Sequence, residues 1–315
     1  MRLASGLTFA LVVTCASAGA SAIPLLTGFG GPTGFGTNQL FLNDDQSSGA
    51  IDLTPAFAGG LRYFGSTYST FYVNNNGNIT FSAPLGTFTP SSFPIASQPM
   101  IAPWWGDVDT RGGGDPAMNG VWWYVERGRV VVTWDNVGYY GTHNDRLNSF
   151  QLVLSEDPAC PGPGNFDVEF RYARCEWTTG DASGGMGGFG GTPAQAGFDA
   201  GNLSDYYAIP GSLTMSILDV CTTSNGGAPG DYLFTICDGV ITGGCPGAGA
   251  PCTVPGQRGE CAHGVNHCAG TGGTVCAQIH MPSLDFCDGL DNDCNGAVDD
   301  RVDRDRSQLN SRHNN

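Results

Sequence analysis

Short runs of β-branched and aromatic residues, separated by turn residues, recur across residues 61–236 and constrain the fold more than any other feature of the chain. Four of these runs are Val121–Val125, Arg129–Trp134, Phe150–Leu154 and Asp167–Tyr172. In the last of them charged and apolar side chains alternate, which is the pattern of a strand with one solvated face. No segment carries the apolar period of an amphipathic helix of three turns. The sequence therefore predicts an all-β fold, an antiparallel β-sandwich followed by a small, irregular, disulfide-rich C-terminal module.

Two hairpins are indicated by their turn residues. Gly128 stands between two strand runs in the segment ERGRV, and Asn76-Gly77 stands within YVNNNGNITF. Asn-Gly is a strong short-range signal of a two-residue hairpin turn, in which both residues adopt positive φ. We therefore expect positive φ at Asn76 and at Gly77, and a loss of stability when Gly77 receives a β-branched side chain.

The first 22 residues, MRLASGLTFALVVTCASAGASA, have the features of a secretory signal peptide. One Arg precedes an apolar run, and Ala20 and Ala22 form an A-x-A cleavage site, so the mature chain is expected to begin at Ile23. The run is too short and too rich in Ala, Gly and Ser for a membrane anchor. Lipoprotein processing at Cys15 is disfavoured because Thr14 replaces the usual small Gly or Ala. The mature chain is thus expected to be secreted or held at the cell surface, with no membrane span.

The chain is strongly acidic, with a net charge of −16 at pH 7 and an isoelectric point near 4.3. Such a surface repels phosphate backbones, which argues against nucleic acid as a partner. The same charge favours the binding of cations.

Of the 12 cysteines, all but Cys15 remain once the leader is removed, and exported proteins use cysteine mainly for disulfides. The remaining number is odd, so at least one thiol is free or pairs outside the set. Cysteines become dense after residue 238, which sets the expected boundaries. The expected segments of the chain are a signal peptide at 1–22, a β-domain at 23–238, a linker at 239–251, a cysteine-rich metal-binding module at 252–300 and a disordered polar tail at 301–315.

The cysteine-rich module is too short and too poor in apolar residues to fold on a hydrophobic core, so it depends on disulfides. Six cysteines allow about fifteen pairings, and the sequence does not choose among them. A zinc site at His263, His267 and the neighbouring Cys268 is the weaker alternative, because disulfides compete for the thiols.

The segment CDGLDNDCNGAVDD, Cys287–Asp300, is the strongest candidate for a metal site. Cys287 and Cys294 are close enough in sequence for a disulfide between them to close a small ring. Carboxylate and amide side chains recur at alternate positions, as in an EF-hand-like loop, with Gly296 at the sharp bend. The expected metal ligands are Asp291, Asp293, Asn295, Asp299 and Asp300.

Calcium is the cofactor that these ligands favour, since hard oxygens without His or Met suit it better than copper. The loop departs from an EF-hand because its last position is Val302 rather than Glu and no helices flank it. The alternative is an acidic, disulfide-tied turn that binds nothing tightly. Residues 288–300 also resemble the DGxDNDCxGxxDE core of a metal-binding motif of bacterial surface proteins, named after the copper-binding protein MopE, with Asp300 in place of the final Glu.

Two groups of polar residues in the β-domain invite a catalytic interpretation. His143, Asp145 and Ser149 lie close in sequence, but no G-x-S-x-G elbow accompanies them, and a polar loop is the favoured interpretation. Asp107 and Asp109 face the same way if they lie on a strand.

Two carboxylates on one side of a strand repel one another unless a positive charge or backbone N–H groups offset the repulsion. Arg111 is the next residue on that face. A buried Asp–Arg pair is therefore favoured over a calcium site, to which Asp181 would add a further carboxylate.

Six aromatic residues form adjacent pairs, in which one member faces out for sugar stacking or partner contact unless loops cover both faces of the sandwich. The pairs are Trp104-Trp105, Trp122-Trp123 and Tyr139-Tyr140.

Five blocks of the β-domain, in order along the chain, resemble the NIDO domain, the extracellular domain of nidogen, alpha-tectorin and a membrane mucin. They are YVNNNGNITF, FTPSSFPIASQPMIAPWWGDVDTR, VVVTWDNVGYYGTHNDRLNSFQLVL, WTTGDASGGMGGFGGTPAQAGFDAGN and YYAIPGSLTMSILD. The resemblance spans residues 36–236. It implies an extracellular module linked to cell–matrix adhesion, with no catalytic and no cofactor-binding residues.

The leading hypothesis is an exported, non-enzymatic adhesion or extracellular-matrix-interaction protein with a calcium-stabilised cysteine-rich tail, whose partner is an extracellular protein or a glycan surface. One alternative is a secreted hydrolase acting on glycans through Asp107 and Asp109, and another is a surface metal-binding protein. Carboxylates roughly 5–10 Å apart in an aromatic cleft favour the hydrolase. Burial of the same carboxylates against Arg111 favours adhesion.

Overall fold

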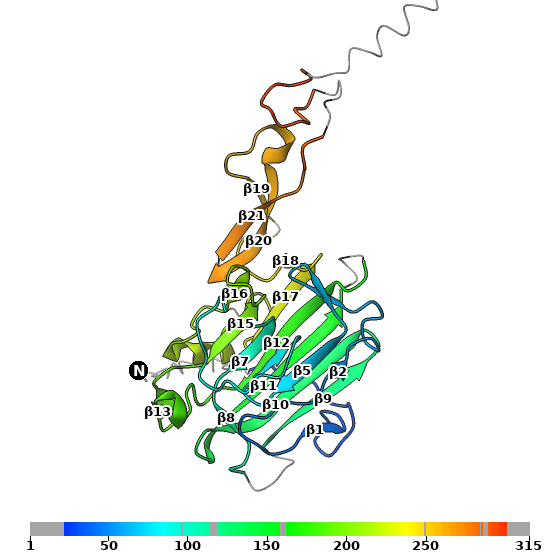
Figure 1. Ribbon diagram of the computed structural model, residues 1–315. Helices are drawn as coiled ribbons and strands as arrows, with labels where there is room; N and C mark the ends of the chain where they lie inside the picture. The colour runs from blue at the N-terminus through cyan, green and yellow to red at the C-terminus, as the bar shows by residue number, and fades with distance from the viewer. Residues whose placement is uncertain are drawn as a thin grey trace, which may run out of the picture.

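The computed structural model describes residues 22–95, 97–113, 119–157, 160, 162–248, 250–271, 273–283, 285 and 289–300. Within these ranges the predicted all-β architecture is confirmed, because two large, mainly antiparallel sheets face one another (Figure 1). The helical segments described are 3₁₀ helices, η1 (Asp181–Ser183), η2 (Met215–Cys221) and η3 (Gly259–Ala262). No described helix has the length and apolar character needed to cross a bilayer.

The first sheet contains the four strands predicted from their β-branched and aromatic runs. Its order is β1 (Asn38–Leu40), β9 (Gly120–Glu126), β10 (Arg129–Tyr139), β11 (His143–Glu156), β12 (Phe166–Arg174), β17 (Asp231–Cys237) and β18 (Val240–Ile241), with β8 (Val108–Asp109) paired to β10. Arg129 pairs with Glu126 across the β9–β10 turn, which confirms the hairpin predicted at Gly128, and Gly128 has φ of 74°.

The second sheet joins the β-domain to the cysteine-rich module. Its order is β2 (Ile51–Asp52), β5 (Thr70–Asn74), β6 (Asn78–Thr80), β7 (Met100–Trp105), β15 (Gln195–Asp199), β16 (Tyr206–Ala208), β20 (His263–Thr271) and β19 (Pro251–Thr253), with β21 (Gly273–Gln278) paired to β20. Two small hairpins complete the fold, β3 (Leu61–Tyr63) with β4 (Ser66–Tyr68) and β13 (Gly185–Met186) with β14 (Phe189–Gly190).

Large aromatic side chains from both sheets fill the space between them. The rings of Trp104 on β7 and Phe150 on β11 lie 6.2 Å apart, and those of Phe170 on β12 and Phe198 on β15 lie 5.2 Å apart. All four side chains are fully buried. Each such burial contributes about 2–3 kcal/mol, so this layer holds the two sheets together.

Strand β12 shows how the sequence pattern sets the faces of the sheet. Its apolar residues Phe166, Val168, Phe170 and Tyr172 are buried, while the alternating charged residues are only partly covered, as predicted. The outer face is stabilised locally, because the Arg171 guanidinium pairs with a carboxylate on its own strand and donates to a backbone carbonyl near the N-terminus.

The burial of the paired aromatic residues decides between the two interpretations of these pairs. Trp104 and Trp105 are both buried, and the indole of Trp105 donates a hydrogen bond of 2.7 Å to the carbonyl of Thr87. Of the six paired aromatic residues, Tyr140 alone is exposed, at 37 %. The pairs therefore do not form the outward-facing aromatic surface that sugar stacking requires.

The β5–β6 turn is buried rather than exposed. Asn74 pairs with Asn78, so the loop holds three residues, Asn75, Asn76 and Gly77, rather than two. Gly77 has φ of 76°, as predicted, but Asn76 is not among the residues with positive φ, so that part of the prediction is wrong. A three-residue loop needs the left-handed conformation only at its final glycine.

Residues 239–251, expected to be a linker, contain ordered structure. Strand β18 pairs with β17, and Cys245 forms a disulfide with Cys268 on β20. Strand β20 also pairs in parallel with β16. In Figure 1 the β20–β21 hairpin stands at the β16 edge and the cysteine-rich module extends away from the sandwich. The module is therefore attached by a covalent bond and a strand pair.

The Gly77 position allows a test of the buried turn with a matched glycine as control. A Cβ at Gly77 would lie 1.8 Å from the Trp104 carbonyl oxygen, whereas a Cβ at Gly65, which has φ of 78°, meets nothing within 4 Å. Gly65→Ala should cost about 1 kcal/mol of backbone strain. Gly77→Ala should cost about 3 kcal/mol or more, because backbone must also move. Denaturant unfolding of the two variants measures the difference, and equal costs would show that the turn is not packed as described.

Candidate functional site

The C-terminal acidic loop brings the predicted ligands Asp291, Asp293 and Asn295 together. The Asp291 carboxylate accepts backbone hydrogen bonds from Asn295 N at 3.1 Å and Gly296 N at 2.9 Å. One Asp293 oxygen accepts from Asn295 N at 3.1 Å, and the other accepts from Asn295 Nδ2 at 2.9 Å. The alternate spacing thus turns these side chains inward, with Gly296, at φ of 99°, forming the bend.

Asp285 belongs to the same cluster and was missed in the sequence. Asp285, Asp291 and Asp293 each place one carboxylate oxygen within 4.8 Å of the others, and Asp285 and Asp291 are 4 % and 6 % exposed. Burial would raise the pKa of Asp285, but backbone N–H groups of Asp293 and Asn292 outweigh it and lower that pKa. Asp285 precedes the recognised motif, so the only signal for it was a further acid upstream of Asp291.

Asp299 and Asp300 occupy different places around the loop. Asp300 Oδ1 accepts a 3.0 Å hydrogen bond from Asn295 Nδ2, which places it beside the cluster. Asp299 Oδ1 instead accepts a 3.3 Å bond from the backbone of Gly289. The structure thus brings four of the five predicted ligands to one side and turns Asp299 toward the start of the loop.

The disulfide predicted between Cys287 and Cys294 is wrong, because Cys294 is bonded to Cys261. Cys287 lies outside the described residues. The backbone N–H of Glu260 donates a 3.1 Å bond to the Asp291 carbonyl, so the loop is held against η3 at two points. The described disulfides are Cys160–Cys237, Cys175–Cys221, Cys245–Cys268, Cys252–Cys276 and Cys261–Cys294.

The His143, Asp145 and Ser149 side chains do not assemble into a catalytic triad. His143 Nε2 lies 3.0 Å from Asp181, and Asp145 accepts from the Tyr139 hydroxyl at 2.9 Å. Ser149 Oγ donates to Asp135 at 3.2 Å. A hydrolase needs the nucleophile within hydrogen-bond reach of the base, and here each member of the group has a different partner.

Asp109 pairs with Arg111 as the sequence favoured, but only Asp109 is buried, since the Arg111 side chain is 45 % exposed. Arg111 Nη2 lies 2.7 Å from the Asp109 carboxylate and 3.0 Å from that of Asp44. Burial opposes ionisation of Asp109, but hydrogen bonds from Arg111 and from the backbone of Thr142 prevail and lower its pKa. A carboxylate held in this way is a structural ion pair rather than a catalytic base.

Asp107 is also buried but has a different environment. Its side chain is 1 % exposed, and burial together with the carboxylates of Asp44, Asp45, Asp109 and Asp181 raises its pKa to about 7. Both carboxyl groups are buried, at 1 % and 0 % exposure, whereas the carboxyl pair of a glycan hydrolase must flank a bound sugar.

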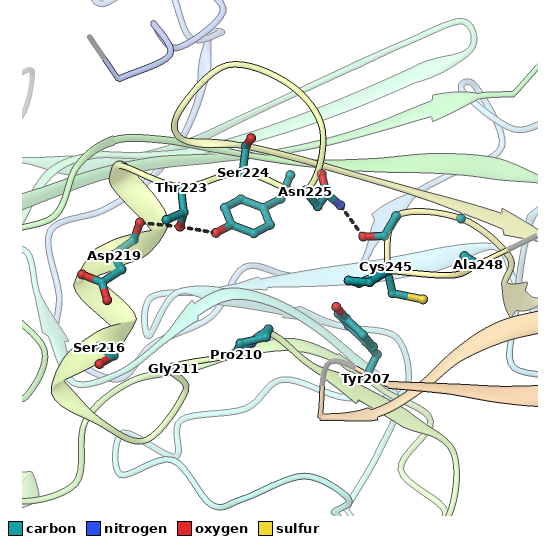
Figure 2. A pocket seen from close by; sticks show the side chains of 14 residues that line it. Tyr207, Pro210, Gly211, Ser216, Asp219, Thr223, Ser224, Asn225, Cys245 and Ala248 are labelled. Carbon is teal, nitrogen blue, oxygen red and sulfur yellow. Dashed lines mark hydrogen bonds between the residues drawn. The ribbon is translucent and has the colours of Figure 1, made fainter. Parts of the chain in front are cut away.

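A pocket of about 660 Å³ opens beside η2, with Tyr207 and Pro210 on one side and Ser224 and Asn225 on the other (Figure 2). Several polar groups of its lining have hydrogen-bond partners within the protein. Thr223 Oγ1 and the Tyr232 hydroxyl lie 2.6 Å apart, Asn225 Nδ2 donates to the Gly244 carbonyl at 2.7 Å, and Cys245 is disulfide-bonded. The described lining therefore offers no nucleophile paired with a base.

Comparisons with known proteins give the family of the β-domain. The family model described as "Nidogen-like domain" matches residues 69–119 and 116–238, together more than half of the 315 residues. No solved structure matches the chain.

Three relatives illustrate the range of similarity. Alpha-tectorin of Mus musculus is 37% identical over 218 residues, which is 61% of this chain and 10% of the relative. Nidogen of Drosophila melanogaster is 26% identical over 233 residues, 63% of this chain and 17% of the relative. Dendrite extension defective protein 1 of Caenorhabditis elegans is 26% identical over 197 residues, 56% of this chain and 16% of the relative.

The chain spans only about a tenth to a sixth of the length of these curated relatives. The similarity is confined to one domain, and the family model covers most of the sandwich that β5–β17 build. The chain belongs to the family of proteins with a nidogen-like domain.

Proposed function

We propose that this chain is an exported, non-enzymatic adhesion or matrix-interaction protein, in which a nidogen-like domain carries a cysteine-rich, calcium-stabilised module. The observation that carries the proposal is membership of the nidogen-like domain family, because its relatives include alpha-tectorin and nidogen. The N-terminal signal features and the disulfides of the described residues support export into an oxidising compartment.

The chemistry of the β-domain supports a binding role. Asp109 is held by Arg111, and His143 and Ser149 lie in separate hydrogen-bonded pairs, so the residues that invited a catalytic interpretation serve the structure instead. The net charge of −16 disfavours nucleic acid as a partner, and the partner we propose is an extracellular protein or a glycan surface.

We expect the mature chain to bind reconstituted basement-membrane extract saturably in a solid-phase assay. Chain that has been reduced and alkylated is the control, because the disulfides maintain the fold. Binding by native chain alone, without release of sugar from the extract, is the expected result. Absence of saturable binding together with glycan hydrolysis would contradict the proposal and favour the hydrolase.

The cysteine-rich module supplies the calcium half of the proposal. Asp285, Asp291 and Asp293 converge, and the amide of Asn295 and the carboxylate of Asp300 lie beside them. This set consists of hard oxygen donors, which suit calcium. The Cys261–Cys294 bond holds the loop in place before a cation arrives, which reduces the ordering entropy that binding must overcome.

Calorimetry with calcium on the full chain should show a site in the range of about 10⁻⁴ to 10⁻³ M, as in extracellular modules. Asp291→Asn should abolish this site and leave the melting temperature of the β-domain unchanged, because the two are far apart. Unchanged calcium uptake by Asp291→Asn would show that the acidic loop is only a stapled turn.

The role of the disulfide can be tested separately. Replacing both Cys261 and Cys294 by Ser should weaken calcium binding at the acidic loop by about tenfold or more. Replacing both Cys252 and Cys276 by Ser is the matched control, since that bond does not close on the loop. Equal affinities in the two double variants would rule out preorganisation by Cys261–Cys294.

A further inference from the structure

The carboxylate of Asp107 has no hydrogen-bond partner among the described residues. Both of its oxygens are inaccessible, and neither lies within hydrogen-bond distance of a donor or acceptor. Burying a carboxylate without a partner is very unfavourable, so buried acids are almost always paired, hydrogen-bonded or bound to a metal. Asp109, two residues away, shows the paired solution, since it has Arg111 and a backbone N–H.

Two more carboxylates lie around Asp107. Asp44, Asp45 and Asp107 each place one oxygen within 4.8 Å of the others, and Asp44 Oδ1 is likewise buried without a partner. Oxygens bound to one calcium ion at about 2.4 Å are separated by no more than about 4.8 Å, so these three fit a common ion. Arg111 contacts Asp44 and Asp109 but no ion pair joins it to Asp107.

The β5–β6 turn lies beside these carboxylates and carries a further oxygen without a partner. Asn75 Nδ2 donates to the backbone carbonyls of Asp44 and Val108, and its Oδ1 is buried with no partner. Asn76 Nδ2 donates to Asp45 Oδ1 at 2.9 Å, which orients that carboxylate. The amide of Asn75 thus lies between the two segments that supply the carboxylates.

A glycine covers the other side of the cluster. A Cβ at Gly180 would lie 2.5 Å from Asp107 Oδ2, so only glycine allows this close approach. The chain at Gly180 thus packs directly against Asp107, whose side chain is 1 % exposed.

Protonation of Asp107 would not by itself give its carboxyl group a hydrogen-bond partner. A neutral carboxyl must still donate its proton to an acceptor, and no described acceptor lies within hydrogen-bond distance of Asp107. A cation would contact one oxygen of each of the three carboxylates, and it would also offset their mutual repulsion.

We propose that Asp44, Asp45 and Asp107, with the side-chain oxygen of Asn75, bind a calcium ion inside the nidogen-like domain. The ligands are hard oxygens from three separate loops, an irregular set that suits calcium better than the strict octahedron of magnesium. The ion would fasten the loop between β1 and β2 to the β5–β6 turn and to β8. This site is independent of the acidic loop of the cysteine-rich module.

The test is calcium-dependent melting of the full chain in the Asp291→Asn background, which silences the acidic loop. Calcium at saturating concentration should raise the melting temperature by about 4 °C or more over the chelator-treated protein. Adding Asp107→Asn should abolish that shift and remove one bound calcium per chain in equilibrium dialysis. If the acidic loop binds no calcium, Asp291→Asn does not change calcium binding. The proposal for the acidic loop and the proposal for the nidogen-like domain can therefore fail independently.

Asp199→Asn is the matched control. Asp199 is equally buried, but it accepts backbone hydrogen bonds from Ile95 at 2.9 Å and Gly201 at 2.6 Å. Its replacement should lower the melting temperature equally with and without calcium and keep the calcium shift. If Asp107→Asn does not fold, Asp45→Asn, on a partly exposed side chain, should weaken calcium binding at least tenfold. The proposal would be overturned if Asp107→Asn or Asp45→Asn kept both the calcium-dependent rise in melting temperature and the bound calcium. It would also be overturned if the Asp291→Asn protein itself showed neither the rise nor the bound calcium.

Discussion

The buried turn formed by Asn75, Asn76 and Gly77 is the contact on which the rest of the β-domain depends. Its backbone oxygens accept hydrogen bonds from Trp104 N at 3.1 Å, Gly106 N at 3.2 Å and the Trp134 indole at 3.0 Å. Turn residues usually lie at the surface, where water satisfies them. Here side chains and backbone from both sheets do so instead, and the buried Asn76 side chain also accepts a hydrogen bond from the first residue of β8.

This arrangement explains why Asp107 and Asp109, two residues apart, have different environments. Asn76 Oδ1 accepts from Val108 N at 3.0 Å, which sets the start of β8 between Asp107 and Asp109. The Asp109 carboxylate pairs with Arg111, and the Asp107 side chain is buried in the interior. A rigid sandwich with covered aromatic faces and an ordered attachment to a disulfide-linked module is suited to presenting a binding surface.

Local sequence signals predicted the parts of the fold that depend on neighbouring residues. The alternation along Asp167–Tyr172 and the glycine in the β9–β10 turn were sufficient for those strands, because the side-chain period and the turn geometry are local properties. The Asn76-Gly77 pair located a hairpin but not its three-residue loop, which docking against Trp104 selects.

Contacts between residues that are far apart in the sequence could not be predicted from local sequence signals. Cys294 has a near neighbour in sequence at Cys287, yet it bonds to Cys261 because η3 packs on the acidic loop. Asp44 and Asp107, far apart in the sequence, are brought together by the β5–β6 turn and by hydrogen bonds between Asn43 and Thr110. Asp291 and Asp293 were predictable because their spacing is short, whereas Asp285 lay outside any motif.

Native-state amide hydrogen exchange tests most directly whether the buried turn holds the domain together. The amides of Trp104, Gly106 and Val108 donate to the turn, so they should exchange only through global unfolding and belong to the slowest class. The amides of Ser204 and Asp205, which donate to an exposed side chain, should exchange much faster through local opening. If the three turn-bound amides exchanged as fast as those of Ser204 and Asp205, the turn would be opening independently and the account would be contradicted.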